Sequence, residues 1–367
     1  MRILHLDPDD VDNPLSGGGP RRNLEIYRRL SSRHEITVLT PTFPGSTPEI
    51  ERDGIRYVRL GRKIGDHGSS HHITFFFALP AAVRRFQHDL LIEDFMPPTS
   101  ATLNPLFTKA PVIASVQWFY ARALAKQYRI PFGFFETHGL KLYKNFIVLT
   151  ESMQEHIQKQ RQNGKFAVIP NGVDDQLFEL PATPGEYIFY LGLIDFELKG
   201  VDLLLEAYAR QSPASRLPLV LAGHCHDRKR LDERIAELKL ETCVRLLGKI
   251  DAQKRLTLMQ NARFVCVPSR WETFCMVAAE ACAAATPVIV FDIPPLNEVV
   301  PTQGCRLVPP FDVDELAAAL EDLSTTPDAT IIKMGEICRN FAQRYRWDIV
   351  AEAQEKFFLE VAQEATG

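Results

Sequence analysis

Short apolar runs alternate with amphipathic stretches along most of this chain. In the first half the apolar runs have the length of buried strands, which we expect at 2–6, 35–40, 55–60, 89–94, 111–116, 145–150 and 166–170. Between them, stretches such as 21–30 place apolar residues at helical spacing and predict helices. Alternating strands and helices predict a parallel sheet with helices on both faces.

The same alternation starts again after the polar, proline-containing segment 171–186. Here we expect strands at 187–192, 217–223, 244–248, 263–268 and 287–292, and helices at 201–210 and 232–240. The pattern predicts an α/β protein with two doubly wound, Rossmann-like domains, 1–170 and 171–346, facing each other across a cleft. A last helix expected near 347–363 either completes the second domain or crosses back onto the first. Open α/β sheets bind ligands at the carboxyl ends of their strands, so the chemistry is expected in those loops.

Length and charge agree with two ordinary globular domains. The chain has 367 residues, and single cores tend to split beyond about 250–300 residues. A net charge of −4 argues against a protein built to bind nucleic acid. We find neither an apolar run long enough to span a membrane nor a signal peptide, and expect a cytoplasmic protein, possibly peripheral on the inner membrane face. The seven cysteines lack zinc-site spacing and are expected to be core residues in a reducing compartment.

A glycine-rich turn follows the first expected strand. Gly17, Gly18 and Gly19 stand between that strand and the first helix, where backbone N–H groups can approach a phosphate. A dinucleotide fingerprint would need a third spaced glycine, but Arg22 occupies that position, which disfavours hydride transfer on a nicotinamide cofactor. Taken alone, the segment can also be a flexible loop.

Three loops of the second half carry further candidates. Lys199 precedes the helix at 201–210, where its ammonium and the helix N-terminus together suit a diphosphate, although an isolated lysine is as often a surface residue. Gly192 and Gly223 end strands, and Lys249 follows another strand-ending glycine. Such loops allow close approach by a base or a ribose.

The strongest signal is a pair of glutamates with seven residues between them. Glu272 lies just past a strand and Glu280 lies inside an alanine-rich helix. A carboxylate can accept two hydrogen bonds from a vicinal diol, so one glutamate can hold a ribose and the other a sugar ring. The alternative is that Glu272 only stabilises the helix N-terminus while Glu280 faces solvent.

These motifs resemble the retaining family 4 glycosyltransferases, which have the GT-B fold. The resemblance rests on VIPNGVD (168–174), KGVDLLLEAY (199–208), PSRWETF (268–274) with Glu280, and PVIVFDIPPL (287–296), and less specifically on GGGPRRNLEIYRRL (17–30) and HEITVLT (34–40). It implies a first, acceptor-side domain and a second domain that binds a nucleotide sugar. It also implies that a C-terminal helix, 347–367, returns to the first domain.

The resemblance assigns roles within the E-x7-E motif and its neighbours. It implies that Glu280 binds the ribose hydroxyls and that Glu272 binds the transferred sugar. It also implies that Lys199 binds the diphosphate and that the loop 17–19 binds the same phosphates. The remaining donor-binding candidates are Gly192, Gly223, Lys249, Arg270, Thr273, Phe274 and Cys275.

Three positions depart from the family pattern. Leu193 replaces an arginine that normally assists Lys199, so that Arg270 or Arg21 would have to compensate. Cys275 replaces a glycine, and Gln117 replaces a histidine.

The segment 119–135 interleaves basic and aromatic residues, and five arginines crowd 21–33. Such a mixture can lie on an anionic membrane, as for transferases with lipid acceptors. The alternative is an ordinary amphipathic helix with acceptor-domain core.

Together these features favour a retaining, metal-independent hexosyltransferase. We expect it to use a UDP- or GDP-sugar and a hydroxyl acceptor, which can be a glycan, a lipid-linked sugar or a small molecule, and to need no cofactor. Two alternatives stay open: a nucleotide-sugar-binding protein with little or no transferase activity, and a sugar-nucleotide epimerase.

Overall fold

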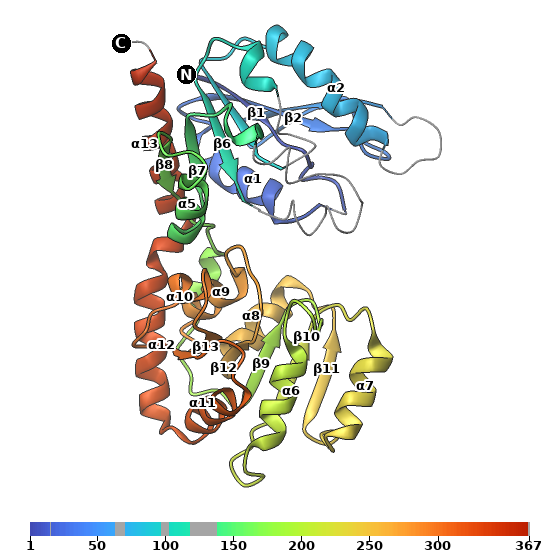
Figure 1. The fold of residues 1–367 in the computed structure, drawn as a ribbon, viewed down its shortest axis with the longest axis vertical. Helices are drawn as coiled ribbons and strands as arrows, with labels where there is room; N and C mark the ends of the chain where they lie inside the picture. Colours follow the sequence, from blue (N-terminus) through green and yellow to red (C-terminus); the bar gives the residue numbers. More distant parts are fainter. Residues whose placement is uncertain (15, 63–69, 97–102, 118–137, 366–367) are drawn as a thin grey trace. The chain divides into compact units, whose positions relative to one another are not determined.

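The chain folds into two compact units. The computed structural model describes residues 1–14, 16–62, 70–96, 103–117 and 138–365. One unit comprises Met1–Asn171 together with Trp347–Gly367, and the other comprises Gly172–Arg346 (Figure 1). Each contains a predominantly parallel sheet, so the predicted α/β class is confirmed.

The first unit is built on an eight-stranded sheet with the order β3-β4-β2-β1-β5-β6-β7-β8. Every neighbouring pair is parallel except β3 and β4. The chain winds outward from β1 through β2 and then returns to the other side of β1 to form β5, so the winding direction changes between β1 and β5. The strands are β1 (Arg2–Leu6), β2 (Glu35–Pro41), β3 (Glu49–Arg52), β4 (Ile55–Leu60), β5 (Leu90–Asp94), β6 (Val112–Val116), β7 (Asn145–Val148) and β8 (Lys165–Val168).

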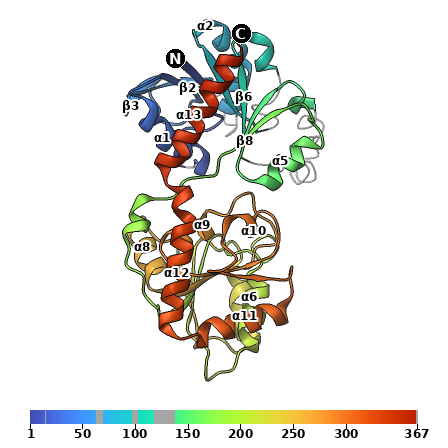
Figure 2. The same cartoon turned by 90° about the vertical axis from the view of Figure 1, so that its left-hand side faces the viewer.

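The C-terminal helix packs on this first unit, as the sequence predicts. Helix α13 (Trp347–Glu364) contributes Trp347 and Phe358 to a core that includes Ile26 and Tyr27 of α1 (Gly18–Leu30). Figure 2 shows α13 running along this unit. Covering segments elsewhere in the unit are α2 (Ser70–Arg85), α5 (Glu151–Gln158) and the 3-10 turn η1 (Asn104–Phe107).

The second unit is built on a six-stranded, fully parallel sheet with the order β11-β10-β9-β12-β13-β14. Its winding direction changes between β9 and β12, which are neighbours. The strands are β9 (Tyr187–Leu191), β10 (Leu219–Ala222), β11 (Val244–Gly248), β12 (Ala262–Val267), β13 (Val288–Phe291) and β14 (Arg306–Val308).

Helices cover both faces of this second sheet, which explains its uninterrupted apolar strands. The central strands are buried along their length, and Phe189, Phe264 and Phe291 are each 0% exposed. The helices are α6 (Val201–Arg210), α7 (Arg228–Glu237), α8 (Ala252–Gln260), α9 (Met276–Ala283), α10 (Leu296–Val299), α11 (Val313–Thr325) and α12 (Asp328–Ala342), with 3-10 turns η2 (Asp175–Glu179) and η3 (Gln343–Tyr345). Within the described residues, no helix of either unit combines the length and apolarity that a membrane span requires.

Several elements were not among the predicted ones, among them β3, β14 and α2. Strand β3 is exposed along its whole length and therefore shows no apolar alternation. It pairs with β4 through a turn in which Asp53 and Gly54 both have positive φ, at 52° and 74°, and an Asp-Gly pair of this kind is a hairpin signal. Strand β14 has only three residues, and α2 contains Pro80, which interrupts a helical pattern.

The ends of β9, β10 and β11 approach one another through backbone contacts that only glycine permits. Gly223 has φ +137°, and a Cβ placed on it would lie 1.7 Å from the carbonyl oxygen of Gly192. Gly192 N–H in turn donates to Ala222 O at 3.0 Å, and Gly223 N–H donates to Gly248 O at 2.8 Å. Gly223 thus fixes how the loops after these strands lie against each other.

We predict that Gly223→Ala destabilises the protein far more than Gly248→Ala. Gly248 also has a positive φ, +70°, but open space surrounds its missing Cβ, so alanine there should cost only the left-handed backbone strain of about 1–2 kcal/mol. Gly223→Ala adds overpacking and should cost about 3 kcal/mol or more. Urea unfolding of both variants measures the difference; equal costs would mean that the Gly192–Gly223 approach is not constrained.

Candidate active site

The candidate residues of the second unit gather where the winding direction of its sheet changes. The loop 192–200 follows β9, and the loop 268–275 follows β12, which is the strand beside β9. Because both strands are parallel, the two loops leave the same edge of the sheet. In open α/β sheets this position is the usual place for a ligand.

Gly200 holds the first of these loops against the second. It adopts a left-handed conformation, φ 64°, at the N-terminus of α6, and a Cβ on it would lie 2.0 Å from Pro268 O. The loop before it is fixed by Asp195, whose Oδ1 accepts a hydrogen bond from Leu198 N at 2.6 Å. This close approach places Lys199 beside the loop that carries Glu272.

Lys199 and Glu272 form an ion pair. Lys199 Nζ lies 2.6 Å from Glu272 Oε1, and the same oxygen accepts a hydrogen bond from Ser269 Oγ at 2.7 Å. The Lys199 side chain is 28% exposed and that of Glu272 is 12% exposed. A cation and a carboxylate are therefore accessible side by side at the N-terminal end of α6.

Glu280 is also paired, with an arginine that sequence reasoning missed. Arg255 of α8 places Nη1 at 2.5 Å from Glu280 Oε1 and Nη2 at 3.6 Å from Asp174 Oδ2. Glu280 is 5% exposed, so its carboxylate does not face open solvent. Arg255 lies 25 residues before Glu280, and neither residue carries a local signal that they will meet.

Arg270 is engaged elsewhere in the same loops. Its guanidinium makes a two-pronged contact with Asp202 at 2.8 and 2.7 Å and donates to Phe196 O. Asp202 lies in the first turn of α6. In this structure Arg270 ties the two loops together, while Leu193 is half-buried and its carbonyl accepts from Tyr190 Oη at 2.6 Å.

Cys275 begins α9 in a conformation that glycine normally adopts. It has φ 76° and ψ 73°, and no side chain caps the helix. Burial raises the pKa of its thiol, as does Glu272, so the side chain is neutral at physiological pH. Phe274 beside it is buried and packs edge-to-face on Tyr345, with ring centroids 5.6 Å apart. The glycine expected from the family pattern therefore corresponds to a real backbone requirement.

Helices α1, α6 and α9 all begin without a side-chain cap, at Gly17, Gly200 and Cys275. By contrast, α7 and α8 are capped by Asp227 and Asp251. Uncapped N-termini leave backbone N–H groups and the positive end of the helix dipole for an anion.

The other candidates of the second unit lie in the same strand-end loops. Lys249 is exposed after Gly248, and Thr273 is half-buried between Glu272 and Phe274. Gly192 and Gly223 make the backbone contacts described above.

The glycine loop lies in the first unit, after β1. No atom comes within 4 Å of a Cβ placed on Gly17 or Gly18, whereas one on Gly19 would lie 3.6 Å from Gln117 Oε1. Gly17 N–H donates to Asp9 Oδ2 at 3.1 Å, and Arg21 is exposed on α1. The basic and aromatic segment 119–135 lies outside the described residues.

A buried polar network lies at the corresponding point of the first unit, between β1 and β5. Asn23 Nδ2 donates to Asp7 Oδ2 at 2.9 Å and to Asp94 Oδ2 at 2.8 Å. His5 Nε2 lies 3.4 Å from Asp94 Oδ1, and Gln117 Nε2 donates to the same oxygen at 3.4 Å. Burial and the neighbouring Asp94 raise the pKa of Asp7 well above its usual range, which favours the uncharged form of this carboxyl group. Gln117 thus belongs to the network around Asp94, and its side chain also lies near Gly19.

The chain contains several Asp-x-Asp sequences, and one that the expectation of a metal-free protein left out, Asp7-Pro8-Asp9, directly follows β1. Ligand atoms of His5, Asp7 and Asp94 lie within 4.8 Å of one another. However, the Asn23 amide already bridges the two carboxyl groups, and Asp9 binds the backbone of Gly17. The hydrogen bonds account for this cluster without an ion.

Family models match both halves of the chain. The model described as Glycosyltransferase Family 4 matches residues 16–177, and the one described as Glycosyl transferases group 1 matches residues 173–344.

Three curated relatives are mannosyltransferases. A phosphatidyl-myo-inositol mannosyltransferase of Mycolicibacterium smegmatis is 26% identical over 96% of this chain and 92% of its own. A GDP-mannose:cellobiosyl-diphosphopolyprenol alpha-mannosyltransferase of Xanthomonas campestris is 26% identical over 95% and 93%. An MMP alpha-(1->4)-mannosyltransferase of Mycolicibacterium hassiacum is 33% identical, but the match spans only 50% of this chain and 46% of that protein.

Solved structures with the same fold cover the whole chain. A sucrose-phosphate synthase from Thermosynechococcus elongatus has a TM-score of 0.79 at 21% identity, covering 99% of this chain and 100% of its own. The Anabaena protein HepE, solved with UDP and glucose, has a TM-score of 0.72 at 17% identity, covering 98% and 100%.

We predict that Cys275→Gly is more stable than Cys275→Ala by about 1 kcal/mol, because alanine keeps the left-handed strain and glycine removes it. The usual order is the reverse: inside a helix, glycine is less stable than alanine by about 1 kcal/mol. Ala278→Gly, within α9, provides that reference. Denaturant unfolding of the three variants tests the prediction, and an alanine variant as stable as the glycine variant would disprove strain at Cys275.

Proposed function

Because this chain belongs to the family 4 glycosyltransferases and has their GT-B fold, we propose that it transfers a hexose from a nucleoside diphosphate sugar to a hydroxyl acceptor. The reaction would retain the configuration at the sugar and need neither a metal nor a cofactor. The observation that carries the proposal is the pair of cation–carboxylate contacts, Lys199–Glu272 and Arg255–Glu280, in the second unit.

The nucleoside diphosphate and the sugar of the donor could each bind to side chains or backbone groups of this site. Glu280 would accept hydrogen bonds from the ribose hydroxyls, and Glu272 would hold the transferred sugar. Lys199 and the uncapped N-termini of α6 and α9 would stabilise the negative charge that develops on the leaving diphosphate. In the first unit, the backbone N–H groups of Gly18 and Gly19 would suit a phosphate, whereas that of Gly17 donates to Asp9.

Arg255 is the residue we propose in place of the arginine that the family has at the position of Leu193. Of the two substitutes expected from the sequence, Arg270 is held by Asp202 and Arg21 is exposed on α1 of the first unit. Arg255, in contrast, already contacts the carboxylate assigned to the ribose. When the ribose hydroxyls take Glu280, one guanidinium N–H of Arg255 becomes available to the diphosphate.

The names of the relatives, rather than the geometry of the site, narrow the choice of donor and acceptor. The Xanthomonas relative is named for GDP-mannose and HepE was solved with UDP and glucose, so a GDP- or UDP-hexose is proposed, with GDP-mannose the first to test. Two relatives are named for lipid acceptors, which supports a lipid-linked acceptor and a protein that works at the cytoplasmic face of a membrane.

A second candidate function is the binding of a nucleotide sugar without catalytic turnover. It is favoured by the three departures from the family pattern, at Leu193, Cys275 and Gln117. Single-turnover assays with GDP-mannose and UDP-glucose separate the two. Donor hydrolysis or transfer supports the enzyme; nucleotide binding without donor consumption supports the binder. A donor converted to a different sugar nucleotide would indicate an epimerase instead.

We predict that Glu280→Ala weakens binding of GDP or UDP, whichever the wild type prefers, by about tenfold to a hundredfold. This corresponds to the loss of a charged hydrogen bond, about 1.5–3 kcal/mol. Isothermal calorimetry measures it, with Glu233→Ala on the exposed face of α7 as the matched control. Unchanged affinity in Glu280→Ala would remove the ribose assignment.

Lys199→Ala is expected to lower the single-turnover rate by about a hundredfold or more, because it removes a charge from the leaving group. Its stability should change by no more than about 1 kcal/mol, since the pair with Glu272 is partly exposed. Lys229→Ala, an exposed change on α7, controls for general effects of losing a lysine. A variant that melts much lower yet transfers at the normal rate would make Lys199 structural.

A further inference from the structure

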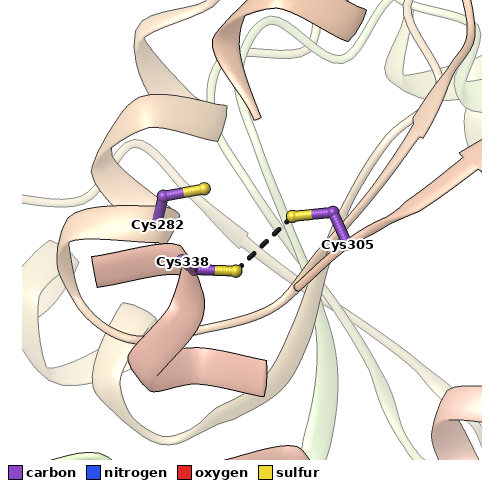
Figure 3. A group of neighbouring side chains, drawn as sticks. All are labelled: Cys282, Cys305 and Cys338. Carbon is purple, nitrogen blue, oxygen red and sulfur yellow. Dashed lines mark hydrogen bonds between the residues drawn. The ribbon is translucent and has the colours of Figure 1, made fainter. Parts of the chain in front are cut away.

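Three cysteine side chains meet in the core of the second unit (Figure 3). Cys282 lies on α9, Cys305 directly precedes β14, and Cys338 lies on α12. Their Sγ atoms all lie within 4.8 Å of one another, and those of Cys305 and Cys338 are 3.5 Å apart. Each residue is at most 2% exposed. Three segments distant in the sequence therefore bring three soft ligand atoms to one point.

The backbone around this cysteine cluster is shaped to the sulfur atoms. Cys338 Sγ donates to Gly304 O at 3.2 Å, and a Cβ on Gly304 would lie 2.7 Å from Cys338 Sγ. Glycine at position 304 thus makes room for the thiol. Among the described residues, the candidate ligand group consists of these three sulfurs alone, without a histidine or a carboxylate.

Two arginines provide positive charge beside the cluster. Arg306 follows Cys305 in the chain, and its Nη1 donates to Cys305 O at 3.4 Å. Arg339 follows Cys338 and donates Nε–H to Ala283 O, at the residue after Cys282, over 3.2 Å. Both guanidinium groups therefore bind backbone carbonyls next to the cysteine cluster.

We propose that Cys282, Cys305 and Cys338 form a binding site for one soft metal ion, and that Cu⁺ is the ion that fits it. Thiolate ligands select soft ions such as Cu⁺ and Zn²⁺. Structural Zn²⁺ takes four ligands, and the cluster offers three in a closed core. Each thiol that becomes a ligand releases its proton to solvent. The copper keeps its oxidation state, so no oxidant or reductant takes part.

A bound ion would add a direct link among three elements of the second unit that already meet through packing and a few hydrogen bonds. Cys282 stands two residues after Glu280 on α9, and Cys338 anchors α12. Because metal binding adds its free energy to the folded state alone, Cu⁺ should raise the melting temperature. The inference does not depend on the proposed transferase activity, since its readouts are metal content and stability.

The test is a titration of the reduced full-length protein with Cu⁺ under anaerobic conditions, in competition with a chromogenic Cu⁺ chelator. We expect the wild type to retain one equivalent. Cys305→Ala and Cys338→Ala should each bind at least about tenfold more weakly. Cys266→Ala is the matched control, because Cys266 is also buried, on β12, but lies outside the cluster.

X-ray absorption at the copper edge of the loaded wild type needs no variant and should show only sulfur neighbours. Nitrogen or oxygen neighbours would overturn the site, as would retention of Cu⁺ in folded Cys305→Ala at wild-type affinity. Absence of a retained equivalent in the wild type would overturn it as well. If Zn²⁺ is retained more tightly than Cu⁺ in the same competition, the choice of ion is wrong.

Discussion

The change of winding direction in each sheet is the constraint on which the rest of this structure depends. In the second unit β9 and β12 are neighbours, yet the chain leaves them toward opposite sides, to β10 and to β13. Their carboxyl ends therefore lie side by side without a crossing connection above them. The space is filled by two loops, and the contact of Gly200 with Pro268 holds those loops together. The first unit repeats the arrangement between β1 and β5, with Asp7 and Asp94 at the strand ends.

The charges gathered at these strand ends are balanced within each unit. Lys199 faces Glu272 and Arg255 faces Glu280, so the second unit keeps its carboxylates without leaving a buried charge unpaired. In the first unit, the Asn23 amide donates to both Asp7 and Asp94, and the raised pKa of Asp7 favours its uncharged form. An anionic ligand would then bind by exchanging partners with groups already in position, which limits the reorganisation that binding requires.

Periodicity predicted the buried strands well because burial on both faces leaves a continuous apolar run. The run at 287–292 contains β13, which is buried throughout, whereas the exposed β3 gave no such signal. The motifs identified Lys199, Glu272 and Glu280 as candidate site residues. They did not predict which side chains these residues pair with, because the pairings depend on which strands become neighbours. Arg255 was missed for the same reason: its position on α8 is unremarkable until α8 and α9 are folded. The special backbone at Cys275 could be predicted in part. The family pattern expects a glycine at this position, and the positive φ of Cys275 explains that preference.

The antiparallel strand β3 affects how molecules of this protein meet one another. It forms one edge of the eight-stranded sheet, it is short, and it carries Glu49, Glu51 and Arg52 on an exposed segment of four residues. An edge strand offers unpaired N–H and C=O groups to any passing strand, and charges on a short edge discourage such pairing. By reversing direction at Asp53 and Gly54, the chain covers the flat parallel edge of β4 with a strand that a second molecule cannot readily extend. This hairpin therefore protects the sheet against aggregation at high protein concentration.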